Sequence, residues 1–301
     1  MKEIIKRILP TPFKKVIYKF IHNYQRRIPV HIKDVFGFDI YQNSADGINY
    51  KKFSGKSFSD VQSTADGRIF YSMDRYITKD SVAIDVGANI GLMTLAMSTL
   101  VGSGGRVYSF EPGPVSYGLL RRNVNTNLLN GNVSIFDNAL SDCEGSFNLF
   151  INLSGESDNQ LHKDLDTYIF KDEESRPSYK VVTTTLDAFI SENSIDYKDI
   201  SYVKIDTEGN ELDVLRGGKS LFTNASKIAV LVEFAPYLKA WENQSIDDFF
   251  NELVSFGFDI YDEANPEAGK VDLDYLKSNY GTKYVSKYTD LLLLKGQSVQ
   301  L

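Results

Sequence analysis

Two short apolar segments of this chain end in acidic residues at a spacing that suits ligand binding. The first, VAIDVGANIG, leads into a turn that contains Asp85, Gly87, Ala88, Asn89 and Gly91. Glycine allows a tight turn and the close approach of a helix or a ligand, and a helix that starts beyond Asn89 supplies unpaired N–H groups. The second segment, RVYSFE, ends in Glu111, about 20 residues after Gly91, where an acid can accept hydrogen bonds from both hydroxyls of a ribose. The two segments together predict a nucleoside site.

The acid in the turn distinguishes two classes of nucleoside. A dinucleotide site has the pattern G-x-G-x-x-G, and a carboxylate beside the pyrophosphate would repel it. This chain instead has D-x-G-x-N-x-G from Asp85 to Gly91. A carboxylate there suits a cation, such as the amino end of the methionine part of S-adenosylmethionine. We therefore predict S-adenosylmethionine as the cofactor in preference to NAD.

A third segment, YVKIDTEG, brings more charges to the same edge of the expected sheet. Because side chains alternate along a strand, Lys204, Asp206 and Glu208 are expected on one face. Burial of unpaired charges is costly, which favours a catalytic role for all three. The structural alternative is an ion pair between Lys204 and Asp206, with Glu208 capping the next helix.

Methyl transfer to a hydroxyl needs a base within hydrogen-bond reach of the acceptor. Of the three histidines, His22 and His31 lie near the N-terminus and His162 lies in a polar insertion. We therefore expect a carboxylate base, Asp206 or Glu208 first and Glu233, at the end of VLVEF, third; His162 is an alternative. The three carboxylates could also hold Mg²⁺, but nothing in the sequence demands an ion and we predict no metal.

Other candidate contacts follow the later segments. Asp137 and Asn138 come just after the apolar segment NVSIF and could meet the adenine edge, although both residue types also favour turns. Tyr237 and Trp241, in APYLKAWENQS, could stack on a sugar face or pack in the core.

The elements that position these residues alternate in type from Ser81 onward. Strands are expected at VAIDV, RVYSFE, NVSIFDNAL, YVKIDTEG, IAVLVEF and TDLLLLKG, and helices at 90–100 and from Pro114. Alternating helices and apolar strands predict a parallel sheet covered on both faces. FNLFI and YKVVTTTL are expected as extra strands beside the polar insertion, and residues 34–78 show only one short strand, Val35–Tyr41.

Six segments resemble the FkbM family of S-adenosylmethionine-dependent methyltransferases, in the family's order over about residues 80–295. They are DVGANIG at 85–91, FEPGPVSYGLLRRN at 110–123, NALSDCEG at 138–145, TTLDAFI at 184–190, VKIDTEGNELDVLRGG at 203–218 and VLVEF at 230–234. The resemblance implies an α/β, Rossmann-like class I methyltransferase fold: a seven-stranded, mostly parallel sheet with helices on both faces, and FGFDIYD and TDLLLLKG as the last, antiparallel pair. It also implies O-methylation of a hydroxyl, with a sugar of a polysaccharide or glycoconjugate as acceptor. Asn210 departs from the family pattern, in which an aromatic or apolar residue is more common.

Charge separates a basic N-terminal segment from an acidic remainder. Residues 1–33 contain nine Lys/Arg and one acid, although the whole chain carries −7. Apolar residues at helical spacing there predict a basic amphipathic helix that contacts an anionic membrane or packs on its own domain. We expect residues 1–60 to form this extension and a connector, and residues 61–297 to form the methyltransferase domain, with an insertion around 147–184. With no secretory signal and no long apolar run, we expect a cytoplasmic protein, with contact to the inner face of the membrane through residues 1–33.

Composition excludes some classes and leaves two alternatives. The single cysteine, Cys143, excludes an internal disulfide framework and a cysteine-rich zinc site, and the acidic body disfavours nucleic acid as a partner. A non-catalytic methyltransferase fold that binds a membrane or a partner protein is one alternative, and an NAD-dependent oxidoreductase is the other.

Overall fold

The computed structural model of the chain describes residues 29–43, 50–61, 64–129, 131–150, 178–236, 245–281 and 287–299. The predicted N-terminal helix, His22, His162, Tyr237 and Trp241 lie outside these ranges. None of the helices within them combines the length and apolar character that crossing a membrane requires.

A seven-stranded sheet forms the centre of the molecule, in the order β11-β12-β10-β9-β3-β4-β5. Its strands are β3 (Val82–Val86), β4 (Arg106–Phe110), β5 (Val133–Phe136), β9 (Ile200–Ile205), β10 (Ile228–Phe234), β11 (Asp259–Asp262) and β12 (Thr289–Lys295). Only β12 runs antiparallel to its sheet neighbours, β10 and β11. The predicted seven-stranded, mostly parallel sheet with a final antiparallel pair is confirmed.

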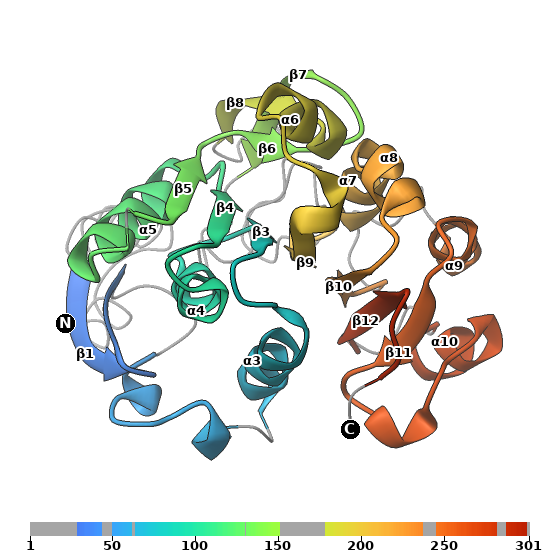
Figure 1. Ribbon diagram of the computed structural model, residues 1–301, viewed down its shortest axis with the longest axis horizontal. Helices are drawn as coiled ribbons and strands as arrows, with labels where there is room; N and C mark the ends of the chain where they lie inside the picture. The colour runs from blue at the N-terminus through green and yellow to red at the C-terminus, as the bar shows by residue number, and fades with distance from the viewer. Residues whose placement is uncertain are drawn as a thin grey trace, which may run out of the picture.

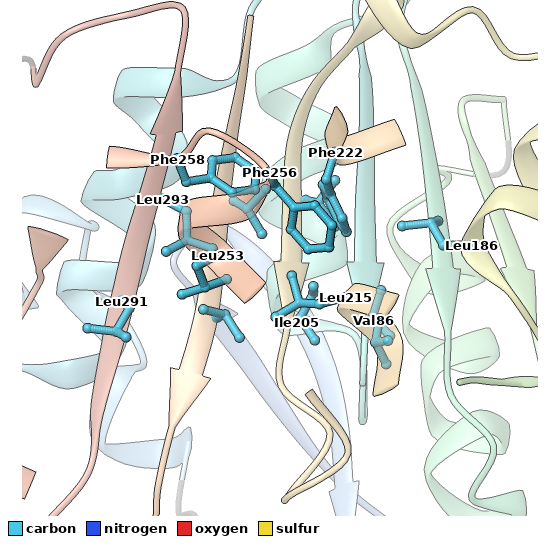
Figure 2. Packing of buried hydrophobic residues seen from close by; sticks show 14 of the residues in the cluster. Val86, Leu186, Ile205, Leu215, Phe222, Leu253, Phe256, Phe258, Leu291 and Leu293 are labelled. Carbon is cyan, nitrogen blue, oxygen red and sulfur yellow. The ribbon is translucent and has the colours of Figure 1, made fainter. Parts of the chain in front are cut away.

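Helices cover both faces of the sheet because its central strands are apolar on both sides (Figure 1). One face packs against α3 (Ala65–Tyr76), α4 (Leu92–Val101) and α5 (Pro114–Thr126). The other packs against α6 (Leu186–Glu192), α7 (Glu211–Gly217), α8 (Lys219–Asn224), α9 (Ile246–Ser255) and α10 (Leu273–Tyr280). Figure 2 shows Phe222, Phe256 and Phe258 gathered over this second face, near Leu293 and Ile205. Short 3₁₀ helices complete the described elements: η1 (Tyr50–Phe53), η2 (Ser59–Val61), η5 (Tyr197–Asp199) and η7 (Pro266–Ala268).

Two strand predictions extended too far along the chain. NVSIFDNAL is divided between β5 and the two-residue strand β6 (Ala139–Leu140), which belongs to a separate three-stranded sheet with β7 (Gly145–Phe150) and β8 (Ser178–Thr184). The expected extra strands therefore exist and pair with each other antiparallel. YVKIDTEG leaves the sheet after Ile205, so its acids lie in the loop that follows β9.

The described part of the N-terminal region is a hairpin rather than one short strand. β1 (Pro29–Val35) pairs with β2 (Phe38–Asn43) through a turn at Phe36 and Gly37, both with positive φ. Asn123 of α5 anchors the hairpin, because its Oδ1 accepts a hydrogen bond from the N–H of Tyr41 at 2.6 Å. The apolar side chains of the hairpin pack in the same core as α3 and α4. Residues 29–43 thus pack as part of the main body of the molecule.

Candidate active site

A pocket opens at the carboxyl ends of β3, β4 and β9, where the strand order reverses on either side of β3. Ligands of open α/β sheets bind at such a point. The predicted site residues that line it are Gly87, Ala88, Asn89, Glu111, Asn138, Lys204, Asp206 and Glu208. The space is about 1060 Å³, counting the part open to solvent, which is enough for a nucleoside-sized ligand. Asp85, Gly91, Asp137 and Glu233 are not part of its lining.

The two glycines of the β3 turn serve contacts within the protein. Gly87 has φ +79°, and a Cβ there would lie 1.7 Å from the carbonyl oxygen of Asp206, so only glycine lets the two loops meet. Gly91 has φ +91°, and its Cβ would lie 2.4 Å from Leu120 Cδ1. Gly91 therefore allows the close approach of helix α5. The sequence had left open whether a helix or a ligand approaches this glycine.

The N–H groups of the same turn are used by the protein itself. Those of Gly87 and Ala88 both donate to the carbonyl oxygen of Phe110 at 3.0 Å. The N–H of Asn89 donates to Glu111 Oε2, and that of Gly113 donates to Glu111 Oε1, each at 2.8 Å. The Glu111 carboxylate is thus held in one orientation at the wall of the pocket.

Asp85 lies beneath the turn and is not among the residues that line the pocket. Its side chain is 0% exposed, and its Oδ2 accepts a hydrogen bond from Thr94 Oγ1 at 2.6 Å. Burial raises the pKa of Asp85, and the positive charge of Lys204 opposes this shift. The cause is register: Asp85 sits between Ser109 and Lys204 on the sheet face that α4 covers.

Lys204 joins the buried acid to the pocket. Its Nζ lies 2.8 Å from Asp206 Oδ2 and 3.9 Å from Asp85 Oδ1. Burial disfavours the charge of Lys204, but the two carboxylates outweigh burial and raise its pKa. The ion pair proposed as the structural alternative is therefore present, although both partners also line or border the pocket.

Asp206 and Glu208 lie in the loop after β9 and not, as the sequence predicted, on one face of a strand. They do not alternate along a strand, because β9 ends at Ile205 and Glu208 has φ +57°. Glu211, the first residue of α7, holds the loop in place, because its Oε1 accepts hydrogen bonds from the N–H groups of Thr207 and Gly209 at 2.9 Å. Burial raises the pKa of Glu211, and these backbone hydrogen bonds counteract the shift.

Asn210 has a structural explanation. Its side chain is 2% exposed, and its Nδ2 donates to the carbonyl oxygen of Leu140 at 3.0 Å. This hydrogen bond ties the loop after β9 to β6 at the far wall of the pocket.

Acidic side chains gather at the end of the pocket near β9 and β10. Asp206, Glu208 and Glu233 each offer a carboxylate oxygen, and these oxygens lie within 4.8 Å of one another. Burial and the charges of Asp206 and Glu208 raise the pKa of Glu233 well above its usual range. Asp290 of β12 lies opposite Glu233 in the sheet, and burial with repulsion from Asp206 raises its pKa to about 7.

Sequence reasoning missed Glu211, Asp290 and Tyr50. Asp290 could have been found, because the first residues of an antiparallel last strand lie at the same edge as the ends of the parallel strands. Glu211 carries no such signal, since it was one of several acids after β9. Tyr50, which lines the pocket from η1, came from a stretch without a recognisable pattern.

Comparison with known proteins agrees with the resemblance. The family model described as "Methyltransferase FkbM domain" matches residues 85–260. Methyltransferase sdnD of Sordaria araneosa is 31% identical over 153 residues, which cover 44% of this chain and 59% of that protein. Methyltransferase 1 of Beauveria bassiana is 28% identical over 148 residues, covering 46% and 58%. The chain thus spans less than two thirds of these relatives.

Solved structures of similar proteins include an FkbM methyltransferase from Methylobacillus flagellatus. It has a TM-score of 0.41 and 16% identity, and the match covers 71% of this chain and 44% of that one. An O-methyltransferase from Thermotoga maritima has a TM-score of 0.39 and 13% identity, with 78% and 67% covered.

Proposed function

Because the chain belongs to the FkbM methyltransferase family, we propose that it is an S-adenosylmethionine-dependent O-methyltransferase. We propose a hydroxyl as its acceptor, in a sugar of a polysaccharide or glycoconjugate. The observation that carries the proposal is the pocket at the switch point of the sheet, with an oriented carboxylate, Glu111, at one end and the acids Asp206 and Glu208 at the other.

The donors and acceptors of the pocket fit this cofactor better than a dinucleotide. A pyrophosphate needs free N–H groups in the turn after the first strand, and those of Gly87, Ala88 and Asn89 already donate within the protein. Acidic groups at the opposite end would repel phosphates and attract a cationic sulfonium or ammonium. The pocket residues therefore suit a nucleoside that carries positive charge.

Each pocket residue has a distinct part in holding such a cofactor. Glu111, whose carboxylate is oriented by the N–H groups of Asn89 and Gly113, would accept hydrogen bonds from the ribose hydroxyls. Asn138 lines the pocket and would meet the adenine edge, whereas Asp137 does not line it. Glu208 would lie nearest the cationic methionine part, and Asp206 would face the acceptor.

The reaction needs a held acceptor and a base. When bound, S-adenosylmethionine supplies the methyl group: the acceptor oxygen bonds to the methyl carbon as the carbon–sulfur bond breaks and its electrons stay on sulfur. A carboxylate of the acidic end takes the hydroxyl proton. Asp206 and Glu208 line the pocket, so they precede Glu233 as candidates for this base. Lys204 would act as a positioning residue, since it fixes Asp206 through its 2.8 Å contact.

Calorimetry with two ligands tests the cofactor assignment. We expect micromolar binding of S-adenosylhomocysteine and none of NAD. Binding of NAD alone would support an oxidoreductase, and binding of neither would support a non-catalytic module.

Asp206→Asn tests the catalytic assignment, with methyl transfer from radiolabelled donor to lysate glycans as the assay. We expect turnover to fall about 100- to 10,000-fold while affinity for S-adenosylhomocysteine changes less than about threefold. Glu267→Gln, at an exposed acid of η7, is the control and should match the wild type. Wild-type turnover in Asp206→Asn would remove Asp206 from the mechanism.

A further inference from the structure

We propose that Asp206, Glu208 and Glu233 form a binding site for a divalent cation that prefers oxygen ligands, such as Mg²⁺ or Mn²⁺. The sequence alone did not require an ion. The binding site itself goes beyond the proposed methyl transfer, whereas its role in holding an acceptor rests on that proposed function.

The geometry of the three carboxylates suits such an ion. Asp206 and Glu208 come from the loop after β9, and Glu233 comes from the end of the neighbouring strand β10. One oxygen of each lies within 4.8 Å of the other two. In an octahedral site with metal–oxygen distances of about 2.1 Å, ligand oxygens lie about 3 to 4.2 Å apart. A small closure of the two loop side chains onto Glu233 would complete three positions.

A buried oxygen without a partner gives an independent reason for a ligand here. Among the described residues, Glu233 Oε2 is shielded from solvent and has no hydrogen-bond partner. Buried carboxylate oxygens are rarely left in this state, because the cost of desolvation is then not offset. Asp85 Oδ1 is also without a hydrogen bond, but Lys204 Nζ lies 3.9 Å from it. No ion pair to Glu233 is formed within the described ranges.

The charge balance favours a cation at the same point. Lys204 contacts both Asp206 and Asp85, so its charge is already shared between two carboxylates and neither contact reaches Glu233. Asp290, opposite Glu233 on β12, adds another acid to this end of the pocket. Since Lys204 bonds to Oδ2 of Asp206, Oδ1 can bind an ion while the ion pair persists.

The position of the site suggests what the ion would do. Asp206 and Glu208 line the pocket, so an ion between them would face the space beside the bound nucleoside. Such ions keep several coordination positions for water or substrate oxygens. An acceptor with two neighbouring oxygens, such as the vicinal hydroxyls of a sugar, could fill two of them and be fixed for transfer.

Mn²⁺ binding to the full chain tests the site without any reaction. The loss of the electron paramagnetic resonance signal of free Mn²⁺ is measured on protein stripped with EDTA, with no nucleoside present. We expect one bound Mn²⁺ per chain, displaced by Mg²⁺, and affinity at least about tenfold lower in Glu233→Gln. Glu267→Gln, which changes charge equally at an exposed site, should bind as the wild type does.

Three results would decide against the proposal. They are no Mn²⁺ binding by the wild type at millimolar concentration, unchanged affinity in a folded Glu233→Gln, and equal weakening in Glu267→Gln. If Glu233→Gln does not fold, Glu208→Gln on the loop replaces it with the same expected loss. S-adenosylhomocysteine binding is measured separately in EDTA, so an absent ion site and an absent nucleoside site give different results.

Discussion

The two ends of the pocket differ in how far their polar groups are paired within the protein. At the end formed by β3 and β4, both oxygens of Glu111 accept backbone hydrogen bonds, and the N–H groups of Gly87 and Ala88 donate to Phe110. At the end formed by β9 and β10, Glu233 has a buried oxygen without a hydrogen bond among the described residues, and Lys204 already pairs with Asp206 and Asp85. Hydrogen bonds within the protein fix the Glu111 carboxylate at the first end, whereas the acids of the second end would be stabilised by a bound cation.

Asp85 and Asp206 show the same contrast in one pair of residues. Both contact Lys204, but the side chain of Asp85 is 0% exposed and that of Asp206 is 35% exposed. A charge that is sealed beneath a turn supports the backbone, and a charge at the wall of a pocket can meet a ligand. Two aspartates near the ends of adjacent strands therefore have different roles, because the turn and α4 bury Asp85 whereas Asp206 is partly exposed at the pocket.

Gly87→Ala should have the largest effect on stability and binding, because it forces the turn after β3 away from the loop after β9. A Cβ would lie 1.7 Å from the carbonyl oxygen of Asp206, and φ is +79°. We expect a loss of at least about 3 kcal/mol in the free energy of unfolding and at least about 100-fold weaker binding of S-adenosylhomocysteine. Thermal and denaturant unfolding with calorimetry measure both.

Gly37→Ala is the matched control for this backbone effect. Gly37 has φ +85°, but nothing lies within 4 Å of the point that a Cβ would occupy, so only the conformational cost of about 1 kcal/mol applies. Equal destabilisation by both substitutions would show that contact between the loops does not matter.

Glu111→Gln tests the paired end directly. The amide nitrogen cannot accept from a backbone N–H, so one of the two hydrogen bonds at 2.8 Å is lost. We expect S-adenosylhomocysteine to bind about 10- to 100-fold more weakly and stability to fall by about 1–2 kcal/mol. Unchanged affinity in a folded variant, with the exposed Glu144→Gln as reference, would remove Glu111 from the ribose site.

Asp290→Asn tests whether repulsion among the acids near β9 and β10 lowers the stability of the protein as pH rises. The pKa of Asp290 is raised to about 7, so the folded protein binds this proton more tightly than the unfolded chain does between about pH 4 and 7. Wild-type stability should therefore fall as pH rises through that window, and the variant should lack this loss. At pH 8 in EDTA we expect the variant to gain about 1–2 kcal/mol, less than the full shift implies because Asp290 is partly exposed.

The comparison between pH 5 and pH 8 provides the check on Asp290. The stabilisation should be small at pH 5 and largest at pH 8, while Asp199→Asn, at an exposed acid of η5, should show no such trend. A constant difference across this range would mean that Asp290 does not titrate with the acidic end.

Asp85→Asn should have the smallest effect on binding. Its side chain makes no contact with the pocket, and the amide oxygen can still accept the hydrogen bond of Thr94. We expect the affinity for S-adenosylhomocysteine to change less than about threefold, within the range of indirect effects. A loss as large as that of Glu111→Gln would restore Asp85 to the cofactor site.

Much of the fold could be predicted because it depends on local signals. The apolar segments VAIDV and IAVLVEF gave strands with the predicted bounds, and Pro114 begins α5 as its preference for the first helical turn indicates. Boundaries were wrong where polar residues follow a strand, as at Asp206, because a strand ends when its neighbours no longer pair with it. That depends on the whole sheet and not on the segment.

The candidate site was predicted in part for a related reason. Glu111, Asn89, Asp206 and Glu208 were located from strand ends and glycines, and all of them line the pocket. Asp85 was predicted to bind the cofactor, and the structure buries its side chain beneath the turn; the sequence shows that an acid lies near a strand end but not which helix covers it. Asp290 was missed because it lies far along the chain from the residues it faces.

The amino-acid sequence by itself determined the alternation of strands and helices, the glycine turn and the family, since these depend on neighbouring residues and their spacing. Only the tertiary structure decided which acids are sealed, which are paired and which face the pocket. Burial and charge pairing arise between segments as distant as β3, β9 and β12, so their energies exist only once the chain has folded.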